Sequence, residues 1–459
     1  MKRTLAEFAQ LCGGRLEGAD GPFTEVVSDS RTLKRGQLFV ALSGPHFNGN
    51  DFVGAALNAG AAGALVTALQ PARLAQIVVP DTQAALERAA RAWRAQFNGP
   101  LVGVAGSNGK TTAKEMTAAI LAQAGDCLAT RGNLNNHIGV PLTLLRLSPE
   151  HRFAVIEMGA NHAGEVAALV ALARPSIGLI TNAGAEHLEG FGSLEGVARA
   201  EGEMVAGLTA TATAVINADD EFASLWRGST RARVVSFGLH QAADFRASEL
   251  RTMVGAHGFR THFRLTAPHG SAAIELALGG EHNVANAVAA AAAASSAGAT
   301  LNHIAAGLGS VRAVPGRLQF KQTAGGAWLI DDSYNANPSS VRAAIQVLAA
   351  LGGRRWLVLG DMGELGDFAA EAHSEIGEFA RAQGIERLYA TGTLMARAVE
   401  SFGAGAYWFA DVTALGGALD AALRESAAEV RVLVKGSRFN RLERVVDALT
   451  GSTGAGGAH

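Results

Sequence analysis

Short apolar runs alternate along the chain with segments whose apolar residues recur at helical spacing. In the first 98 residues this pattern predicts strands at 37–42, 64–67 and 77–79 and helices at 52–59 and 84–97. The alternation returns after residue 318, with strands expected at 328–331, 356–359 and 432–434. Strands and helices that alternate with short connections are typical of α/β proteins, so we expect an α/β fold.

Two strong breakers divide the chain, Asn98-Gly99-Pro100 and Pro315-Gly316. Because the chain has 459 residues and an ordinary domain has about 150, roughly three domains are expected. The breakers place these domains at 1–98, 99–314 and 315–459.

Between the breakers, four apolar runs end in glycine or polar residues or lead directly into them. They lie at 101–105, 153–159, 177–182 and 213–220. Continuous apolar runs of this length are typical of buried parallel strands. Ligands of open α/β sheets bind beyond the carboxyl ends of the strands, so the polar residues at these ends are expected to face one shared site.

The composition narrows the possible partners. Lys and Arg number 39 against 41 Asp and Glu, and the resulting net charge of −2 provides no basic field for nucleic acid or an anionic membrane surface. Charged residues make up 17% of the chain and hydrophobic residues 48%, which excludes a mainly disordered protein. The 56 glycines suit the many tight turns of a large parallel-sheet protein.

No apolar run is long enough to span a membrane, and the run 166–180 is broken by Arg174-Pro175. The first residues reach Glu7 before an apolar core of signal-peptide length forms, so we expect a cytoplasmic protein, and we expect a monomer. Cys12 and Cys127 lack the spacing of a zinc site or a disulfide framework and are expected to be buried small hydrophobic residues.

A glycine-rich loop follows the first central strand and leads into a helical pattern at 113–124. Its residues are Gly106, Ser107, Asn108, Gly109, Lys110, Thr111 and Thr112. In a strand–loop–helix unit the loop N–H groups and the helix N-terminus attract polyphosphate, Lys110 binds the β- and γ-phosphates, and the Thr111 hydroxyl can bind Mg²⁺. The strict pattern would have glycine at Val104. The alternative is a turn with a solvated Lys110.

Read as GSNGKTT, this loop resembles the ATP-binding loop of the Mur ligase family, the ADP-forming amide ligases of bacterial cell-wall synthesis. Segments similar to the family lie along essentially the whole chain: GNLNNHIGVPLTLLRL (132–147), EMGANHAGE (157–165), AEHLEGFGSL (185–194), EHNVANA (281–287), PGRLQ (315–319), DDSYNANPSS (331–340), GDMGELG (360–366) and VKGSR (434–438). The resemblance implies an N-terminal α/β substrate domain, a central parallel-sheet domain with the phosphate loop, and a C-terminal Rossmann-like domain.

The most specific segments, GNLNN and DSYNANP, resemble the branch of the family that joins D-alanyl-D-alanine to UDP-N-acetylmuramoyl-tripeptide. The resemblance implies a ligase that uses ATP and Mg²⁺, forms an acyl phosphate, releases ADP and phosphate, and serves peptidoglycan precursor synthesis. A family ligase that adds the third stem residue, a folylpolyglutamate synthase and a P-loop nucleotide switch without ligase activity stay open as alternatives. The sequence does not indicate whether the tripeptide carries lysine or diaminopimelate.

By the same resemblance, catalytic roles fall to Lys110, Glu157, His187 and Arg317. Glu157 ends a buried strand, where a carboxylate is costly unless it is paired or binds a cation, and with Thr111 it would hold the Mg²⁺ of the nucleotide. A carboxylate that caps a neighbouring helix is the alternative. His187 would bind a second metal ion, although a loop histidine is more often a surface or hydrogen-bonded residue.

Further residues are assigned to the substrates. Asn283 would contact adenine or, alternatively, cap its helix. Arg317 would reach phosphate and Asp332 the ribose, unless the two form a salt bridge between domains. The residues that the resemblance assigns to the UDP-sugar peptide and the incoming amine are Ser30, Arg31, Asn135, Asn136, Asn335, Asn337, Lys435, Ser437 and Arg438, with Asp361 and Glu364. A surface turn is the alternative for Ser30 and Arg31.

Glu201 departs from the family pattern. Many Mur ligases have a lysine carbamate about fourteen residues after the metal-binding histidine, and counting from His187 reaches Glu201. A carbamate presents a carboxylate near the second Mg²⁺, and Glu201 is already a carboxylate, so we interpret it as a replacement. A solvated glutamate on a helix is the alternative.

Overall fold

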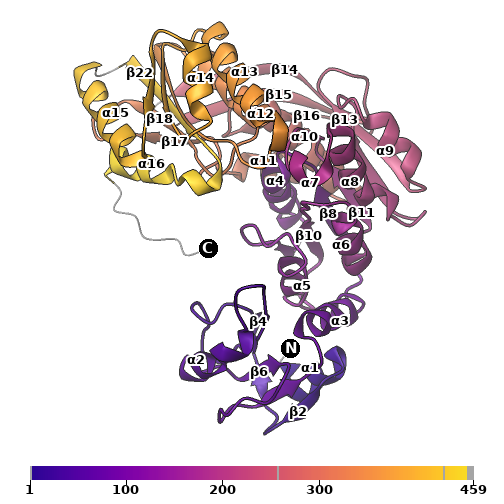
Figure 1. The fold of residues 1–459 in the computed structure, drawn as a ribbon. Helices are drawn as coiled ribbons and strands as arrows, with labels where there is room; N and C mark the ends of the chain where they lie inside the picture. The colour runs from indigo at the N-terminus through magenta and orange to yellow at the C-terminus, as the bar shows by residue number, and fades with distance from the viewer. Residues whose placement is uncertain (1–2, 256–257, 427–428, 452–459) are drawn as a thin grey trace.

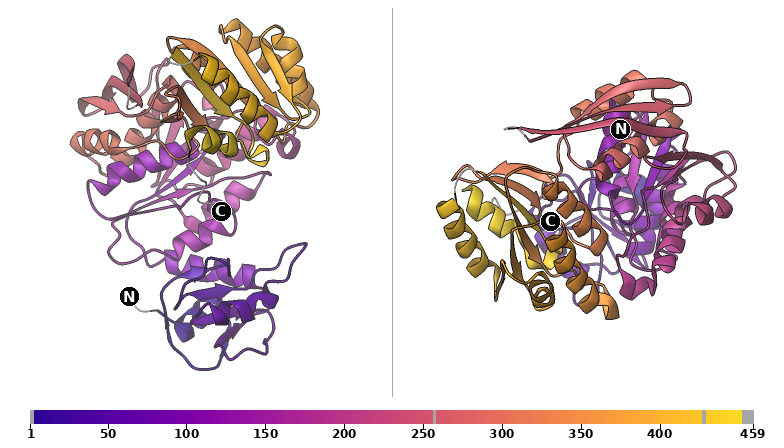
Figure 2. Two further views of the ribbon diagram at one scale, coloured as in Figure 1. Left: turned by 90° about the vertical axis from the view of Figure 1, so that its left-hand side faces the viewer. Right: turned by 90° about the horizontal axis from the view of Figure 1, so that it is seen from above.

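The computed structural model describes residues 3–255, 258–426 and 429–451, which form three α/β domains, each with its own sheet (Figure 1). Figure 2 shows the N-terminal domain at one end of the molecule and the other two side by side. The α/β class and the three-domain architecture predicted from the sequence are confirmed. The expected end of the third domain at residue 459 lies outside the described residues.

The N-terminal domain has a five-stranded sheet. Its order is β2 (Arg15–Glu17), β7 (Gln76–Val78), β6 (Gly63–Val66), β5 (Leu38–Val40) and β4 (Val26–Val27), with β1 (Arg3–Thr4) and β3 (Pro22–Phe23) as a separate pair. Its helices are α1 (Leu5–Cys12), η1 (Gly49–Phe52), α2 (Val53–Asn58) and α3 (Thr82–Arg94). The predicted strands and helices are therefore present with slightly different ends. Helix α3 begins earlier than predicted because the Asp81 side chain caps it by accepting a hydrogen bond from Ala84 N–H.

The central domain is built on a nine-stranded sheet. Its order is β16 (Gly270–Leu276), β15 (Gly258–Ala267), β14 (Phe245–Gly255), β13 (Arg233–Gly238), β12 (Thr213–Asn217), β11 (Ile177–Ile180), β8 (Leu101–Ala105), β10 (Phe153–Glu157) and β9 (Cys127–Ala129). The four strands predicted here are β8, β10, β11 and β12, and they are parallel as expected. Strand β8 lies between β10 and β11, with Val104 beside Glu157 and Ala105 beside Ile180. The phosphate loop therefore leaves the sheet next to Glu157.

Helices cover both faces of this sheet. They are α4 (Lys110–Ala122), α5 (Gly139–Leu144), α6 (Glu165–Ala173), α7 (Leu188–Phe191), α8 (Leu194–Ala206), α9 (Ala223–Ser229), α10 (Glu281–Ser296) and α11 (Leu301–Ser310). Helix α10 buries alanines 289–294 in the same core as Met116 and Ile120 of α4. Small side chains let these two helices and the sheet approach closely, which fixes α4 behind the phosphate loop.

The central sheet has an antiparallel edge beyond the parallel strands that the sequence predicts. Strand β14 pairs in parallel with β13, and β15 and β16 then follow as antiparallel neighbours. Strand β14 alternates buried residues such as Phe245 and Ala247 with exposed ones at its start. A strand with one face in water lacks the continuous apolar run that marks a buried parallel strand.

The C-terminal domain has a six-stranded sheet with helices on both faces. The strand order is β17 (Gln319–Gln322), β18 (Trp328–Asp332), β22 (Val430–Lys435), β19 (Arg354–Gly360), β20 (Arg387–Thr391) and β21 (Ala406–Phe409). The helices are α12 (Pro338–Ala349), η2 (Gly366–Phe368), α13 (Ala369–Ala382), α14 (Met395–Phe402), α15 (Val412–Ser426), η4 (Arg438–Asn440) and α16 (Glu443–Thr450). All strand pairs except β17 with β18 are parallel, so the expected Rossmann-like architecture is confirmed.

Within the part of the chain that the structure describes, no helix is long and apolar enough to cross a membrane. Cys12 is buried and Cys127 half-buried, and both are free thiols. Burial raises the pKa of the Cys127 thiol to about 12, so the thiol stays uncharged, although the expectation that Cys127 is fully buried is wrong.

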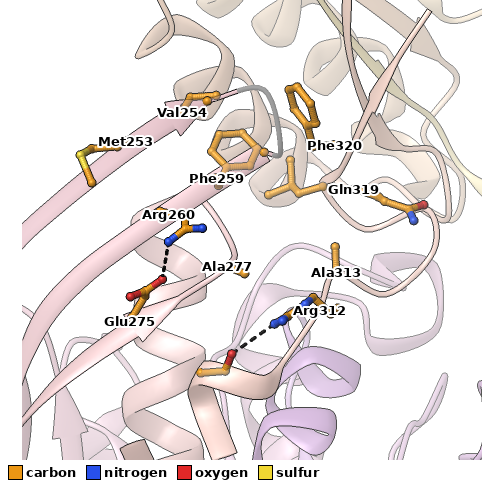
Figure 3. Close-up of a pocket in the computed structure, with 14 residues that line it drawn as sticks. Met253, Val254, Phe259, Arg260, Glu275, Ala277, Arg312, Ala313, Gln319 and Phe320 are labelled. Carbon is orange, nitrogen blue, oxygen red and sulfur yellow. Dashed lines mark hydrogen bonds and ion pairs between the residues drawn. The ribbon is translucent and has the colours of Figure 1, made fainter. Parts of the chain in front are cut away.

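Phe259 of the β14–β15 hairpin joins the central domain to the C-terminal domain (Figure 3). Phe259 is 5% exposed and belongs to the C-terminal core with Leu318 and Ile330. A cavity of about 570 Å³ lies beside Phe259, between β14, β15, the end of α11 and β17. Its lining contains no residue that the sequence assigned to the site, and its main feature is the apolar anchor Phe259.

We expect Phe259→Ala to lower the free energy of unfolding by about 3 kcal/mol, because it removes a buried aromatic ring that two domains share. Urea unfolding measures this change. Met253→Ala is the control, since Met253 is on the same hairpin and 56% exposed. A change in the Phe259 variant as small as in the control would contradict the anchor role.

Candidate functional site

The loop Gly106–Thr112 has the backbone that a phosphate site requires. Gly106 and Gly109 have φ of 121° and 81°, in the region that favours glycine. An added Cβ would lie 2.2 Å from the Thr181 hydroxyl at Gly106 and 2.3 Å from the Asn286 side-chain oxygen at Gly109. Helix α4 begins at Lys110, earlier than predicted, and the N–H groups of a first helical turn have no partner inside the helix. The loop thus combines a tight turn with a helix N-terminus.

Lys110 lies over this loop. Its ammonium donates to the carbonyls of Gly106 at 2.5 Å and Ser107 at 3.1 Å and pairs with Glu186 at 3.2 Å. Burial lowers the pKa of Lys110, but the carboxylates of Glu186, Glu201 and Glu157 outweigh burial and raise it. The alternative of a solvated lysine is wrong, because the side chain is only 15% exposed.

Glu157 ends β10 with a buried carboxylate that is only half satisfied. Oε1 accepts a hydrogen bond of 2.8 Å from the Asn135 amide, and Oε2 is buried without a hydrogen-bond partner. The helix-capping alternative is not supported, since the described partner is a side-chain amide. Glu157 and Thr111 line the same cavity of about 230 Å³ as Lys110. A buried carboxylate oxygen beside a hydroxyl group fits a hard cation such as Mg²⁺.

His187 and Glu201 are held by different partners. His187 Nδ1 is 2.5 Å from Glu364 Oε2 of the C-terminal domain. Glu201 is 1% exposed, so the solvated-glutamate alternative is wrong. Its Oε2 accepts a hydrogen bond of 2.6 Å from Gly106 N–H, while Oε1 is buried without a partner. Burial raises the pKa of Glu201 to about 7, opposed by Lys110.

No three His, Cys, Asp or Glu side chains of the described residues converge closely enough to hold a metal ion by themselves. The carboxylates around the phosphate loop therefore need other oxygen donors to complete a cation site. The phosphates of a bound nucleotide would be such donors.

Asp332 and Lys435 form a buried ion pair in the C-terminal domain. Asp332 Oδ2 accepts a hydrogen bond of 2.7 Å from the Lys435 ammonium, and Oδ1 accepts one of 3.0 Å from Leu318 N–H. The alternative of a salt bridge between Arg317 and Asp332 is therefore wrong. The Arg317 guanidinium instead lies 4.3 Å from the centre of the Tyr334 ring, and its Nε is buried without a hydrogen-bond partner. Arg317 and Asp332 still line the same cavity as Lys110.

Asn283 lies in the first turn of α10. The N-cap of this helix is Gly280, and the Asn283 amide donates to the Gly279 carbonyl, so the N-cap alternative is wrong. Asn283, Asn286 and His282 line a cavity of about 340 Å³ that also contains Gly109. Burial lowers the pKa of His282 to about 4, which leaves a neutral ring in this cavity.

Polar contacts join the phosphate loop to helix α12 across the domain boundary. The Asn108 side chain accepts a hydrogen bond of 2.9 Å from the Asn337 amide and donates one of 2.9 Å to the Ser339 hydroxyl. Asn337 is also the N-cap of α12, and its amide is 3.5 Å from Glu186 Oε2. Residues that the sequence assigned separately to nucleotide and substrate are therefore neighbours.

The remaining assigned residues fall into two groups. A cavity of about 870 Å³ in the same cleft is lined by Asn335, Ser437, Arg438 and Glu364 among others. Asn136 and Arg31 have other partners: Asn136 accepts from Gly139 N–H, and Arg31 pairs with Asp29 on the exposed surface of the N-terminal domain. The described pockets include neither of these two side chains, nor Ser30.

Sequence reasoning missed several residues of the cleft. They are Glu186, Asn133, Asn182, Tyr334 and His282. Glu186 precedes the assigned His187 in the segment AEHLEG, so its position after β11 was the available signal. Its contact with Lys110 depends on tertiary structure.

Known families match this chain over most of its length. The Mur ligase middle domain matches residues 104–294, and the Mur ligase glutamate ligase domain matches residues 316–438. A UDP-N-acetylmuramoyl-tripeptide–D-alanyl-D-alanine ligase of Escherichia coli strain K12 is 46% identical over 448 residues, which cover 97% of this chain and 98% of the relative. This chain belongs to the Mur ligase family.

Solved Mur ligases share its architecture. MurF from Acinetobacter baumannii is 33% identical with a TM-score of 0.90, and the match covers 98% of this chain and 99% of that chain. MurF from Thermotoga maritima in complex with ADP is 26% identical with a TM-score of 0.79, covering 93% of this chain and 97% of that chain. The Mur ligase fold thus extends over all three domains.

In this Mur ligase we expect Lys435→Ala to lower the free energy of unfolding by about 3 kcal/mol, because Asp332 would be left as a buried unpaired charge. Chemical unfolding measures the change, and Arg424→Ala, which removes an exposed ion pair, should cost less than about 1 kcal/mol. The double variant Asp332→Asn with Lys435→Met leaves no unpaired charge at this position. It should therefore recover most of the stability that Lys435→Ala loses. Equal stabilities of Lys435→Ala and the control would disprove the structural role of the pair.

Proposed function

We propose that this protein joins D-alanyl-D-alanine to UDP-N-acetylmuramoyl-tripeptide, with ATP converted to ADP and phosphate, in peptidoglycan precursor synthesis. The observation that carries this proposal is one cleft in which the phosphate loop faces Arg317, Asp332, Asn337 and Lys435 of the C-terminal domain. The full-length relative from Escherichia coli has this activity in its name. We expect a monomer in the cytoplasm.

Amide formation from a free carboxylate is uphill, so the carboxylate must first be activated. Transfer of the ATP γ-phosphoryl group to the tripeptide carboxylate gives an acyl phosphate, which the amine of D-alanyl-D-alanine attacks with loss of phosphate. Lys110, the helix N-terminus at α4 and Arg317 would stabilise the negative charge that spreads over the transferring group. Such a reaction demands positioning and electrostatic stabilisation from the protein rather than covalent catalysis.

Mg²⁺ would be held by Thr111 and Glu157, whose oxygen donors fit it, and would neutralise phosphate charge. His187 and Glu201 are proposed for a second metal ion. His187 would have to exchange its contact with Glu364 for this role, and Glu201 would act through its buried Oε1. The Glu201 assignment keeps our interpretation that its carboxylate replaces a carbamate.

The substrates would bind along the molecule. Ser30 and Arg31 of the N-terminal domain are proposed for the uridine diphosphate, and Asn135 and Asn136 for the tripeptide. Asn283 would contact adenine, and Asp332 the ribose. The larger cleft cavity, with Asn335, Ser437 and Arg438, would receive the dipeptide amine.

ADP release with defined acceptors tests this function. The purified protein is given ATP, Mg²⁺ and UDP-tripeptides that carry either lysine or diaminopimelate. We expect ADP only when D-alanyl-D-alanine is also present, and not with glutamate or a free diamino acid. ATP hydrolysis at the same rate without an acceptor would favour a nucleotide switch and refute the ligase.

We expect Lys110→Ala to lower ligation at least about 100-fold while the fold stays intact, because the ammonium stabilises charge on the transferring group. Initial rates of ADP release measure the loss, and circular dichroism checks the fold. Arg199→Ala, an exposed position on α8, is the control and should keep the wild-type rate. Normal turnover in Lys110→Ala would refute the phosphate role.

For Glu201 we expect activity that does not depend on bicarbonate. Glu201→Ala should lower turnover and raise the Mg²⁺ concentration needed, and Glu201→Lys should regain activity only with added bicarbonate. Glu201→Gln separates a metal role from a structural one, because its amide oxygen can still accept from Gly106 N–H. Full activity of Glu201→Gln at limiting Mg²⁺ would show that the residue only supports the loop.

A further inference from the structure

Glu186 occupies the position next to the phosphate-loop lysine where an anionic ligand is expected. Its Oε1 is 3.2 Å from the Lys110 ammonium, and both side chains are at least 85% buried. Both residues line the same cavity as Thr111 and Glu157. The charge of Lys110 is therefore already neutralised by a protein carboxylate inside the cleft.

The charges around Lys110 are unbalanced. Glu157, Glu186 and Glu201 all act electrostatically on its ammonium, while Arg317 and Lys435 are the other cations that line the cavity. One oxygen of Glu157 and one of Glu201 are buried without a hydrogen-bond partner. Buried carboxylates without partners are costly, and a polyphosphate entering this region would add further negative charge. Arg317 lines the same cavity, and a divalent cation would offset the charge that the polyphosphate adds.

Glu186 also contacts the C-terminal domain. Its Oε2 is 3.5 Å from the amide of Asn337, which donates a hydrogen bond to Asn108 of the phosphate loop. One carboxylate therefore contacts both the lysine of the loop and the N-cap residue of α12. These are the groups that a phosphate bound between the two domains would meet.

We propose that Glu186 is the internal counter-ion of Lys110, which the nucleotide phosphates must displace. The phosphates take over the Lys110 ammonium, and the displaced carboxylate remains close to them as a like charge. A divalent cation removes this repulsion. Glu186 thereby makes nucleotide binding depend on the divalent cation, and it acts as a positioning residue for Lys110.

This inference rests on the proposed function only in taking the loop as the nucleotide site. Its test is nucleotide binding, measured without either acyl or amine substrate. Wild-type protein that binds no ATP would refute the proposed function itself. Wild-type protein that binds ATP, with no effect of the Glu186 variants, would refute only the counter-ion role.

The experiment measures ATP affinity by titration calorimetry in EDTA and again in excess Mg²⁺. We expect Glu186→Gln to bind ATP about tenfold more tightly than wild type in EDTA, because the competing charge is gone. In Mg²⁺ the two proteins should differ less than about threefold, so the gain in affinity from Mg²⁺ shrinks in the variant. Glu195→Gln, an exposed glutamate of α8, should behave as wild type in both buffers.

Two further variants separate charge from shape. Glu186→Asp keeps the negative charge and should retain weak binding in EDTA, whereas Glu186→Ala removes it and should bind as tightly as Glu186→Gln. Thermal unfolding identifies any variant that does not fold, and the remaining variants still decide the outcome. Two results in EDTA would overturn the proposal. One is that Glu186→Gln and Glu186→Ala bind ATP no more tightly than wild type. The other is that Glu186→Asp gains as much affinity as they do.

Discussion

The buried ammonium of Lys110, placed among carboxylates, determines how this site can work. The Lys110 ammonium donates hydrogen bonds to two carbonyls of its own loop, and the carboxylates of Glu157, Glu186 and Glu201 raise its pKa. The free-energy cost of removing these charges from water is offset only when they pair closely, so a shift of one charged group affects the others. The parallel strands enforce the pairing, because β8, β10 and β11 end side by side and carry the loop, Glu157 and the segment before Glu186. Any ligand of this region has to enter an existing set of charge contacts.

The sequence predicted the buried parallel strands and the phosphate loop well because both have local signals. A strand such as β8 is apolar along its whole length, and the glycines of the loop stand where side chains would collide with Thr181 and Asn286. Strands β14 to β16 lacked such a signal. One face of β14 is exposed, and its many polar residues resemble a loop unless the pairing partner is known.

The interaction partners of the site residues also lack a local signal in the sequence. A salt bridge between Arg317 and Asp332 was the alternative to their nucleotide roles, yet Asp332 pairs with Lys435, which is 103 residues away in sequence. Asn283 was weighed as a helix cap, but Gly280 occupies that position. Residue type and neighbourhood identify which side chains carry chemistry. They do not identify the partner, because that depends on which strands the sheet places side by side.

The contacts between the central and C-terminal domains differ in kind at two places. On the β14–β15 hairpin, Phe259 is buried in the apolar core of the C-terminal domain. In the cleft, Asn108, Asn337, Glu186 and His187 make hydrogen bonds or ion pairs across the boundary. An apolar contact is lost only by exposing surface to water, whereas a hydrogen bond can be exchanged for one to a ligand at little net cost. A domain attached in this way can change its contacts at the cleft while Phe259 stays buried, which is the arrangement that a cleft binding several substrates in turn requires.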